Sequence, residues 1–259
     1  MSDRETNSKF RFKQFELSHS ASSMKIGVDG VLVGAWTDSS RVDSSCAASR
    51  QELRILDVGT GCGLIAAMMG QRFPTAHITA IDIHPDSVGV ADENFKASPW
   101  ADRLEAVHAD IDDFVEKSDY QESFDIIVSN PPFFDSGIAN PSTPRENARH
   151  QGVLSPISLL EFASRLLVPS GLLAFIAPSS QKREIISQTF STDLFPLRIC
   201  DVKGAPHLEA KRTLFEFIKP QASDSEDLTT REEQLTIRTE CGSYSPEYIE
   251  LTKDFYLAF

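Results

Sequence analysis

Residues 129–134, written SNPPFF, follow the apolar run FDIIV and hold side chains and carbonyls that could position an amine. The side-chain oxygen of Asn130 and the carbonyl of Pro131 can accept the two hydrogens of a planar amine, which aims the nitrogen lone pair in one direction. Because proline fixes φ and has no N–H, Pro131 and Pro132 stiffen the turn without adding a donor. Phe133 offers a stacking face, worth about 1–3 kcal/mol per nucleobase. These four residues are the predicted catalytic set; the alternative is a strand-ending turn whose rings pack inward.

Three glycines, Gly59, Gly61 and Gly63, alternate along LDVGTGCGLIA. They lie between an apolar strand and a helical segment, which is the setting of a nucleotide-binding turn. Glycine allows unusual backbone angles and lets a ligand approach the main chain. Leu64 stands where the G-x-G-x-x-G fingerprint has its last glycine, which weighs against NAD. The alternative is a glycine turn that binds no ligand.

Two carboxylates follow further along the chain. Asp82 ends the next predicted strand, roughly 20 residues on, where it can accept hydrogen bonds from both hydroxyls of a ribose. Asp110 comes just after another predicted strand and can meet an adenine amino group or, as the alternative, cap the next helix. Taken in chain order with the glycines, these residues predict a nucleoside ligand.

The elements that must position these residues alternate in type. LRILDV (53–58), HITAIDI (77–83), RLEAVHA (103–109) and FDIIVSN (124–130) are short runs rich in β-branched residues, and the segments between them have helical character. This alternation predicts parallel strands joined by crossover helices.

The same pattern continues toward the C-terminus. Residues 155–168 predict a helix that starts at Ser155, GLLAFIAP predicts a strand, and a second helix is expected near Ser180. PLRICDVKG and KRTLFEFIK predict two closing strands paired as a hairpin-like edge, and YIELTKDFYLAF predicts a helix followed by a strand. The expected fold is α/β: a doubly wound, mostly parallel, seven-stranded sheet with a short N-terminal extension.

The domain organisation follows from the position of the first core strand. Residues 51–259 are expected to form the catalytic domain. Residues 1–50 are expected to form an extension, a segment covering the cofactor, and a Ser-rich loop. A second, acidic insertion is predicted within residues 220–234, exposed like the Ser-rich loop.

Composition narrows the function classes. The chain has 259 residues and a net charge of −13, from 25 Lys+Arg against 38 Asp+Glu, which weighs against indiscriminate nucleic-acid binding. The polar N-terminus and the lack of a long apolar run predict a cytoplasmic protein without a membrane span. The four cysteines, Cys46, Cys62, Cys200 and Cys241, lack metal-ligand spacing, so free thiols and no metal site are expected.

In this order, LDVGTGCG, AIDI, HAD and SNPPF resemble the motifs of class I S-adenosylmethionine-dependent methyltransferases, and the last marks the subset that methylates planar nitrogens. The resemblance implies that Gly59–Gly63 border the methionine and ribose of the cofactor, Asp82 the ribose hydroxyls and Asp110 the adenine. The predicted cofactor set also includes Asp57, Ile83, Ile111 and Asn130.

The flanking segments resemble a narrower group. FRFKQFELSHSASSMKIGVDGVLVGAW (10–36), ENFKASPWADR, STPRENARHQ and the ending DFYLAF are similar to bacterial tRNA adenine-N(6)-methyltransferases that modify the adenosine 3′ to the anticodon of a valine tRNA. This resemblance covers nearly the whole chain and implies a tRNA substrate without an obligate protein partner. The alternatives are methylation of a protein glutamine or another nucleic-acid amine, and a non-catalytic cofactor-binding subunit.

Asp29, in KIGVDGVLVGAW, either meets the ammonium group of the cofactor methionine or caps the helix that covers it. Basic side chains after the catalytic turn and elsewhere could meet phosphates around a target base turned out of its stack, although each cluster alone could be a solvated face. The predicted substrate set is Phe133, Arg145, Arg149, His150, Lys13 and Lys182.

Overall fold

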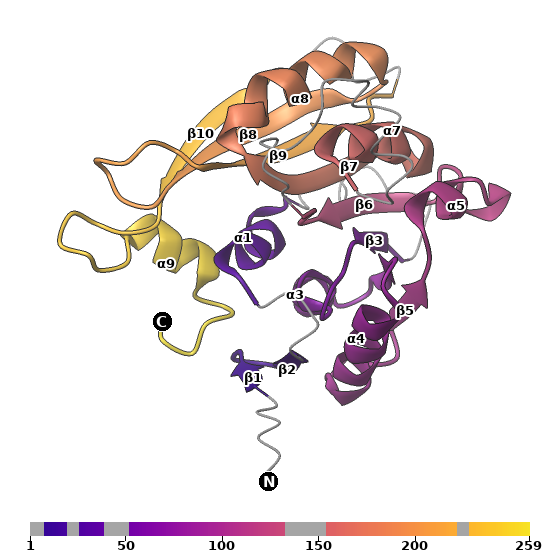
Figure 1. The fold of residues 1–259 in the computed structure, drawn as a ribbon, viewed down its shortest axis with the longest axis horizontal. Helices are drawn as coiled ribbons and strands as arrows, with labels where there is room; N and C mark the ends of the chain where they lie inside the picture. Colours follow the sequence, from indigo (N-terminus) through magenta and orange to yellow (C-terminus); the bar gives the residue numbers. More distant parts are fainter. Residues whose placement is uncertain (1–7, 20–25, 39–51, 133–153, 222–227) are drawn as a thin grey trace, which may run out of the picture.

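The computed structural model describes residues 8–19, 26–38, 52–132, 154–221 and 228–259. Eight strands of these residues form one sheet in the order β10-β8-β9-β7-β6-β3-β4-β5 (Figure 1). All neighbours are parallel except that β9 runs antiparallel to β7 and β8. The strands are β3 (Arg54–Val58), β4 (His77–Asp82), β5 (Leu104–His108), β6 (Phe124–Ser129), β7 (Leu167–Pro178), β8 (Phe195–Lys203), β9 (Arg212–Ile218) and β10 (Arg231–Thr236).

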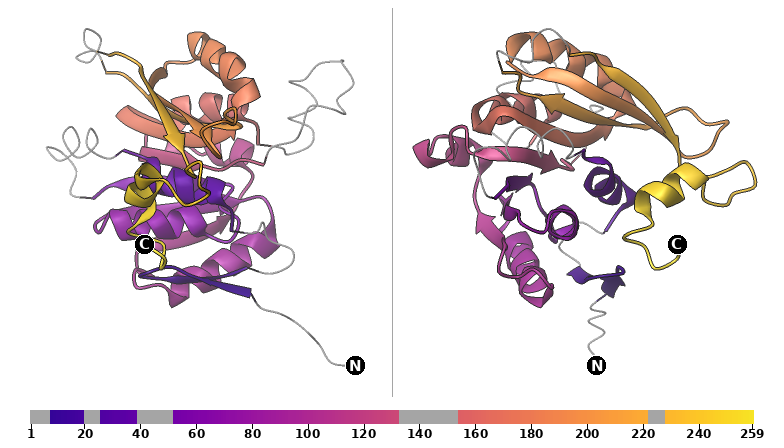
Figure 2. Two further views of the ribbon diagram at one scale, coloured as in Figure 1. Left: turned by 90° about the vertical axis from the view of Figure 1, so that its left-hand side faces the viewer. Right: turned by 180° about the vertical axis from the view of Figure 1, so that it is seen from behind.

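Helices cover both faces of the sheet (Figures 1 and 2). One hydrophobic cluster packs α1 (Val28–Trp36), α3 (Leu64–Arg72), α4 (Pro85–Ala97) and α9 (Pro246–Thr252) against one face. A second cluster packs α5 (Ile111–Val115), α7 (Pro156–Leu166) and α8 (Lys182–Gln188) against the other. Short 3₁₀ turns are η1 (Ser118–Tyr120), η3 (Ser179–Gln181) and η4 (Thr189–Ser191). The predicted doubly wound, mostly parallel sheet is confirmed.

The central strands are buried on both faces, which explains their nearly continuous apolar sequences. Every residue of β6 is buried, and so are four of the five residues of β3. The helix expected at Ser155 is also confirmed: Ser155 caps α7 in a reciprocal capping box with Ser158.

The sheet has eight strands where seven were predicted. The extra strand, β10, pairs with β8, so β8 and β9 form the expected antiparallel pair without forming the edge. β10 begins at Arg231, inside the segment predicted to be an exposed insertion. Only Leu235 of its six residues is buried, because an edge strand with one covered face needs little apolar sequence.

The N- and C-terminal segments meet. An antiparallel hairpin of β1 (Ser8–Arg11) and β2 (Glu16–His19) reaches the chain end, where Phe12 bridges to Tyr256 and the Lys13 amide donates to the Phe255 carbonyl over 2.8 Å. The predicted terminal helix is present as α9 (Pro246–Thr252). The strand predicted after it is absent from the described residues, which have only the isolated bridge at Tyr256 there. The Ser-rich loop predicted at 39–50 lies outside the described residues.

Helices α1 and α3 touch closely along Gly30 and Gly34. A Cβ on Gly30 would lie 2.9 Å from Cδ2 of Leu64, and one on Gly34 would lie 2.7 Å from Sδ of Met68. Glycine at these helical positions lets the backbone of α1 approach α3, and this approach fixes the N-terminal turn of α1 beside the loop that precedes α3.

We expect Gly34→Ala to lower the free energy of unfolding by about 1–2 kcal/mol, because buried Met68 must move to admit a methyl group. Gly89→Ala is the matched control, since Gly89 also lies inside a helix but its Cβ would meet no atom within 4 Å. The control should gain up to about 1 kcal/mol from helix propensity. Urea unfolding curves of both variants measure the difference; equal shifts of the same sign would contradict the α1–α3 contact.

No helix within the described residues is long and apolar enough to cross a lipid bilayer.

Candidate active site

The glycine-rich turn has the conformation that glycine favours. Gly59, Gly61 and Gly63 have φ of 72°, 57° and 85°, which L side chains rarely adopt. The amides of Gly59 and Thr60 donate to the Ile81 carbonyl over 2.9 and 3.0 Å, and these bonds bind the turn to β4. A Cβ on Gly63 would lie 2.4 Å from the ring of Phe95, whereas one on Gly61 would meet nothing within 4 Å. Gly63 thus serves packing, and Gly61 leaves its backbone open to a ligand.

Asp82 lies at the carboxyl end of β4, beside this turn. Its Oδ2 accepts the amide of Gly61 and its Oδ1 accepts the amide of His84, both over 2.9 Å. The residue is 8% exposed. Since each carboxylate oxygen has a second lone pair, Asp82 can shape the turn and also accept hydrogen bonds from a ligand.

Asp57 is fully buried beneath the turn. Its Oδ2 accepts the Thr60 hydroxyl over 2.7 Å and the Ala66 amide over 3.1 Å, while Oδ1 has no partner among the described residues. Burial raises the pKa of the Asp57 carboxyl to about 7, against the effect of these two hydrogen bonds, which favour the charged form. Asp57 therefore supports the turn from below.

Because the folded-state pKa of Asp57 exceeds its unfolded value of 3.8, the folded chain holds a proton there that the unfolded chain releases between about pH 4 and 7. This contribution to stability is present below pH 4 and is lost as the pH rises through 7. Asp57→Asn carries no such proton, so its unfolding free energy relative to wild type should rise from pH 5 to pH 8. Urea unfolding at both pH values measures this. Burial also raises the pKa of Glu216 to about 7. Because Glu216 is present in both proteins, its contribution cancels in the difference between their unfolding free energies. A constant difference would contradict the raised pKa of Asp57.

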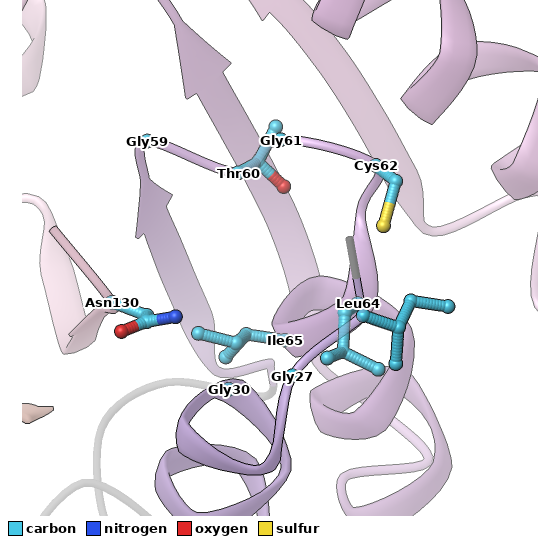
Figure 3. A pocket seen from close by; sticks show the side chains of 10 residues that line it. Gly27, Gly30, Gly59, Thr60, Gly61, Cys62, Leu64, Ile65 and Asn130 are labelled. Atoms are coloured by element: carbon cyan, nitrogen blue, oxygen red, sulfur yellow. The ribbon is translucent and has the colours of Figure 1, made fainter. Parts of the chain in front are cut away.

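Asn130 lies across a pocket from the glycine turn (Figure 3). The pocket is partly open to solvent and has about 380 Å³ of empty space when the solvent at its mouth is included. It is lined by Ile26, Gly27, Gly30, Gly59, Thr60, Gly61, Cys62, Leu64, Ile65 and Asn130. The Oδ1 atom of Asn130 is buried and has no hydrogen-bond partner among the described residues. A buried acceptor without a partner is costly, so this atom is suited to a ligand that brings a donor.

The first turn of α1 forms one wall of the pocket. Gly27 is the N-cap of α1, so the alternative in which Asp29 caps this helix is wrong. Asp29 lies within the first turn, and its Oδ2 is 3.0 Å from Nε of Arg212 at the start of β9. The prediction that Asp29 meets a methionine ammonium stays a prediction.

Asp110 caps α5, since its side chain accepts the Asp112 amide over 2.9 Å. This confirms the capping alternative, and the second oxygen leaves its predicted contact with adenine a prediction. Ile83, which directly follows β4, is 38% exposed, and Ile111 starts α5. All three residues follow the carboxyl ends of β4 and β5, the same edge of the sheet as the glycine turn and Asn130.

The predicted substrate residues that the structure describes are not grouped as the predicted cofactor residues are. Phe133, Arg145, Arg149 and His150 lie outside the described residues, and so does the sequence STPRENARHQ. Lys13 is exposed in the turn between β1 and β2, whereas Lys182 donates to Asp201 over 2.9 Å. Lys9 and Arg11, in the same cluster as Lys13, both contact Glu16. Substrate contacts by all six predicted residues stay predictions.

The structure adds residues that the sequence did not single out. Thr60, Cys62 and Ile65 line the pocket. They lie within the glycine motif or just after it, so the motif could have pointed to them as site residues. Buried Asn94 had no such signal: its amide donates to the carbonyls of Cys62 and Ser18 and accepts the Ser18 amide, over 2.8, 3.0 and 2.9 Å. Asn94 therefore joins the N-terminal hairpin to the glycine turn.

Cys62, Cys200 and Cys241 are free thiols, and Cys46 lies outside the described residues. In the parts of the chain that the structure describes, no three His, Cys, Asp or Glu side chains are grouped as metal ligands.

A methyltransferase small domain model matches residues 39–193, more than half of the chain. The chain belongs to the methyltransferase small domain family. The resemblance predicted from the four motifs is thereby confirmed, and the protein is a methyltransferase.

Curated relatives match this methyltransferase almost end to end. A protein of Flavobacterium johnsoniae is 38% identical over 96% of this chain and 99% of its own length. Proteins of Porphyromonas gingivalis and Actinobacillus succinogenes are each 40% identical, over 95% and 96% of this chain and 94% and 98% of their own. All three are named tRNA1(Val) (adenine(37)-N6)-methyltransferase.

Solved structures are similar in fold. A predicted O-methyltransferase from Agrobacterium tumefaciens superposes with a TM-score of 0.63 at 20% identity, over 88% of this methyltransferase and 96% of that chain. The Pyrococcus horikoshii TYW2 structure, solved with MeSAdo, has a TM-score of 0.55 at 11% identity, over 81% and 70% of the two chains.

Proposed function

We propose that this methyltransferase transfers a methyl group from S-adenosylmethionine to the exocyclic amino nitrogen of an adenosine in tRNA, the one 3′ to the anticodon of a valine tRNA. The near full-length similarity to relatives named for that reaction supports the substrate. The observation that carries the chemistry is the position of Asn130, which lines one pocket with the glycine turn and whose buried Oδ1 has no hydrogen-bond partner among the described residues. A tRNA substrate would place the enzyme in the cytoplasm.

The residues around the pocket fit S-adenosylmethionine. The open backbone at Gly61 would border its methionine and ribose, Asp82 would accept from the ribose hydroxyls, and Asp110, with Ile83 and Ile111 beside it, would meet the adenine. Bound there, the cofactor supplies a methyl group activated by a positively charged sulfur.

The turn after β6 would act on the second reactant. The exocyclic nitrogen of adenine is a poor nucleophile, because its lone pair is delocalised into the ring. The Oδ1 of Asn130 and the carbonyl of Pro131 would accept its two hydrogens and hold the lone pair toward the methyl carbon. The amine would displace the sulfur at the methyl carbon, so that the N–C bond would form as the C–S bond broke, with S-adenosylhomocysteine as the leaving group and one proton passing from the nitrogen to solvent. Positioning and the partial charges of the two acceptors supply the catalysis, without a strong general base.

Phe133 would stack on the target ring. We also propose that residues 51–259 form the catalytic domain and that residues 1–50 form an N-terminal extension, which includes the segment that covers the cofactor and the Ser-rich loop. Val28–Trp36 supports the covering role, since this helix forms a wall of the pocket.

The test is transfer from methyl-labelled S-adenosylmethionine to total RNA from a bacterial strain that lacks this activity, followed by digestion to nucleosides. We expect label in N(6)-methyladenosine from the tRNA fraction, removed by prior nuclease treatment. Label that resists nuclease but not protease would overturn the proposal in favour of a protein glutamine acceptor. Cofactor binding without transfer to any fraction would favour a non-catalytic subunit.

A further inference from the structure

About half of the Lys and Arg side chains in the described residues lie within 4 Å of a carboxylate. Ion pairs at 2.5–3.1 Å hold the following residues to nearby carboxylates: Lys9, Arg11, Lys96, Arg165, Lys182, Arg198, Arg212, Lys219 and Lys253. In a chain of net charge −13, such pairing is expected for cations with structural or solubilising roles.

Three cations for which the described residues offer no acidic partner within 4 Å stand around one loop: Lys203, Lys211 and Arg238. Because Val202 is opposite Arg212 in the β8–β9 ladder, Lys203 and Lys211 flank the loop that joins these strands. The amide of Arg238 donates to the Gly204 carbonyl over 3.2 Å, so β10 brings its cation to the same loop. We call Lys203, Lys211 and Arg238 the basic rim.

The rim lies beside the pocket. Arg212, which follows Lys211, pairs with Asp29, and Asp29 lies between the pocket-lining residues Gly27 and Gly30. The amide of Ser179, after β7, donates to the Lys211 carbonyl over 3.2 Å, and β7 is the neighbour of β6, which Asn130 directly follows. Figures 1 and 2 show the loops after β8 and before α9 projecting next to each other from the molecule.

The side chains of the rim are accessible. Lys211 and Arg238 are exposed and Lys203 is partly exposed. The guanidinium carbon of Arg238 lies over the ring of Tyr244, 4.4 Å from its centre, and the guanidinium donates to the Gly242 carbonyl over 2.7 Å. These contacts hold the cation in place without neutralising it.

Six other cations have no acidic partner within 4 Å among the described residues. Arg54 and Lys117 lie at the opposite, amino edge, over the rings of Phe124 and Phe114. Arg72 and Arg103 donate to backbone carbonyls, Lys13 lies in the turn between β1 and β2, and Arg183 lies in α8.

Among the described residues, the rim is the place where three such cations stand around a single loop, at the same edge of the sheet as Asn130. We propose that the basic rim binds backbone phosphates of the RNA next to the nucleotide that enters the pocket, an inference that rests on the proposed function. Phosphate contacts of this kind position a nucleic acid and do not read its sequence.

The test compares two triple variants of equal charge. The rim variant, Lys203→Ala with Lys211→Ala and Arg238→Ala, should weaken tRNA binding and raise KM for tRNA by about tenfold or more, with kcat at saturating tRNA and cofactor affinity unchanged. The slope of log affinity against log salt should become shallower by about two to three. The control, Lys96→Ala with Lys117→Ala and Arg231→Ala, changes exposed cations elsewhere and should behave as wild type.

A gain-of-function variant avoids any question of folding. Glu209 is exposed in the loop between Lys203 and Lys211, so Glu209→Lys should lower the Kd and KM for tRNA. Unchanged tRNA affinity in the rim variant, or an equal loss of affinity in the control, would overturn the proposal that the rim binds RNA. A wild-type protein that does not bind tRNA would overturn it as well. If wild type binds tRNA through the rim but transfers no methyl group to it, the proposed function is wrong, whereas the proposed RNA binding by the rim is supported.

Discussion

Replacing Asn130 with alanine is expected to lower kcat for methyl transfer by about 10²–10³-fold while S-adenosylmethionine still binds. The side chain provides a buried acceptor without a partner among the described residues, on the pocket wall opposite the glycine turn. Alanine removes that acceptor and leaves the turn itself in place. An amine held by one acceptor instead of two samples many orientations, and few of them aim the lone pair at the methyl carbon.

Single-turnover kinetics with labelled cofactor measure the chemical step, and calorimetry measures cofactor affinity separately. Ser129→Ala is the matched control: Ser129 precedes Asn130, and its hydroxyl donates to the Val58 carbonyl over 2.7 Å inside the sheet. This change should cost stability, about 1 kcal/mol for one buried hydrogen bond, and leave kcat close to wild type. Wild-type turnover by Asn130→Ala would sink the proposed mechanism.

Replacing Asp82 with alanine is expected to have the opposite kinetic signature. The Kd and KM for S-adenosylmethionine should rise by about 10–100-fold, because hydrogen bonds to a charged group contribute about 1.5–3 kcal/mol. The loss has two expected sources: the ribose hydroxyls would lose the acceptor proposed for them, and the amide of Gly61 loses the bond that orients the turn. At saturating cofactor, kcat should fall far less than in Asn130→Ala, since the proposed site puts Asp82 at the ribose and not at the amine.

Asp86→Ala is the control for Asp82→Ala. Asp86 is an exposed carboxylate four residues later, in the first turn of α4, so its loss changes net charge equally without touching the turn. Isothermal titration with S-adenosylmethionine and with S-adenosylhomocysteine should show a loss of affinity only for the Asp82 variant. Equal affinity of the Asp82 variant and wild type would exclude Asp82 from the cofactor site.

Much of the fold was predictable from local sequence, because the strands of a parallel sheet covered on both faces are short apolar runs. That is why β3, β4, β5 and β6 were found at nearly their observed bounds. β10 was missed for the corresponding reason, since a half-covered edge strand with one buried residue resembles an exposed loop. The sequence around Asp110 is compatible with a helix cap and with a ligand contact, and the geometry of α5 confirms the cap.

The sequence by itself determined the residue types of the site: the glycines that need positive φ, the carboxylate that ends β4, and the amide and prolines that end β6. Each is set by its immediate neighbours, because a strand end and a tight turn are local structures. Only the tertiary structure decided what lies around them. Gly30 and Gly34 bring α1 against α3, Arg212 pairs with Asp29 from 183 residues away, and Asn94 joins β2 to the glycine turn. The basic rim likewise depends on the register of three strands, which is fixed by the sheet as a whole and not by any local pattern.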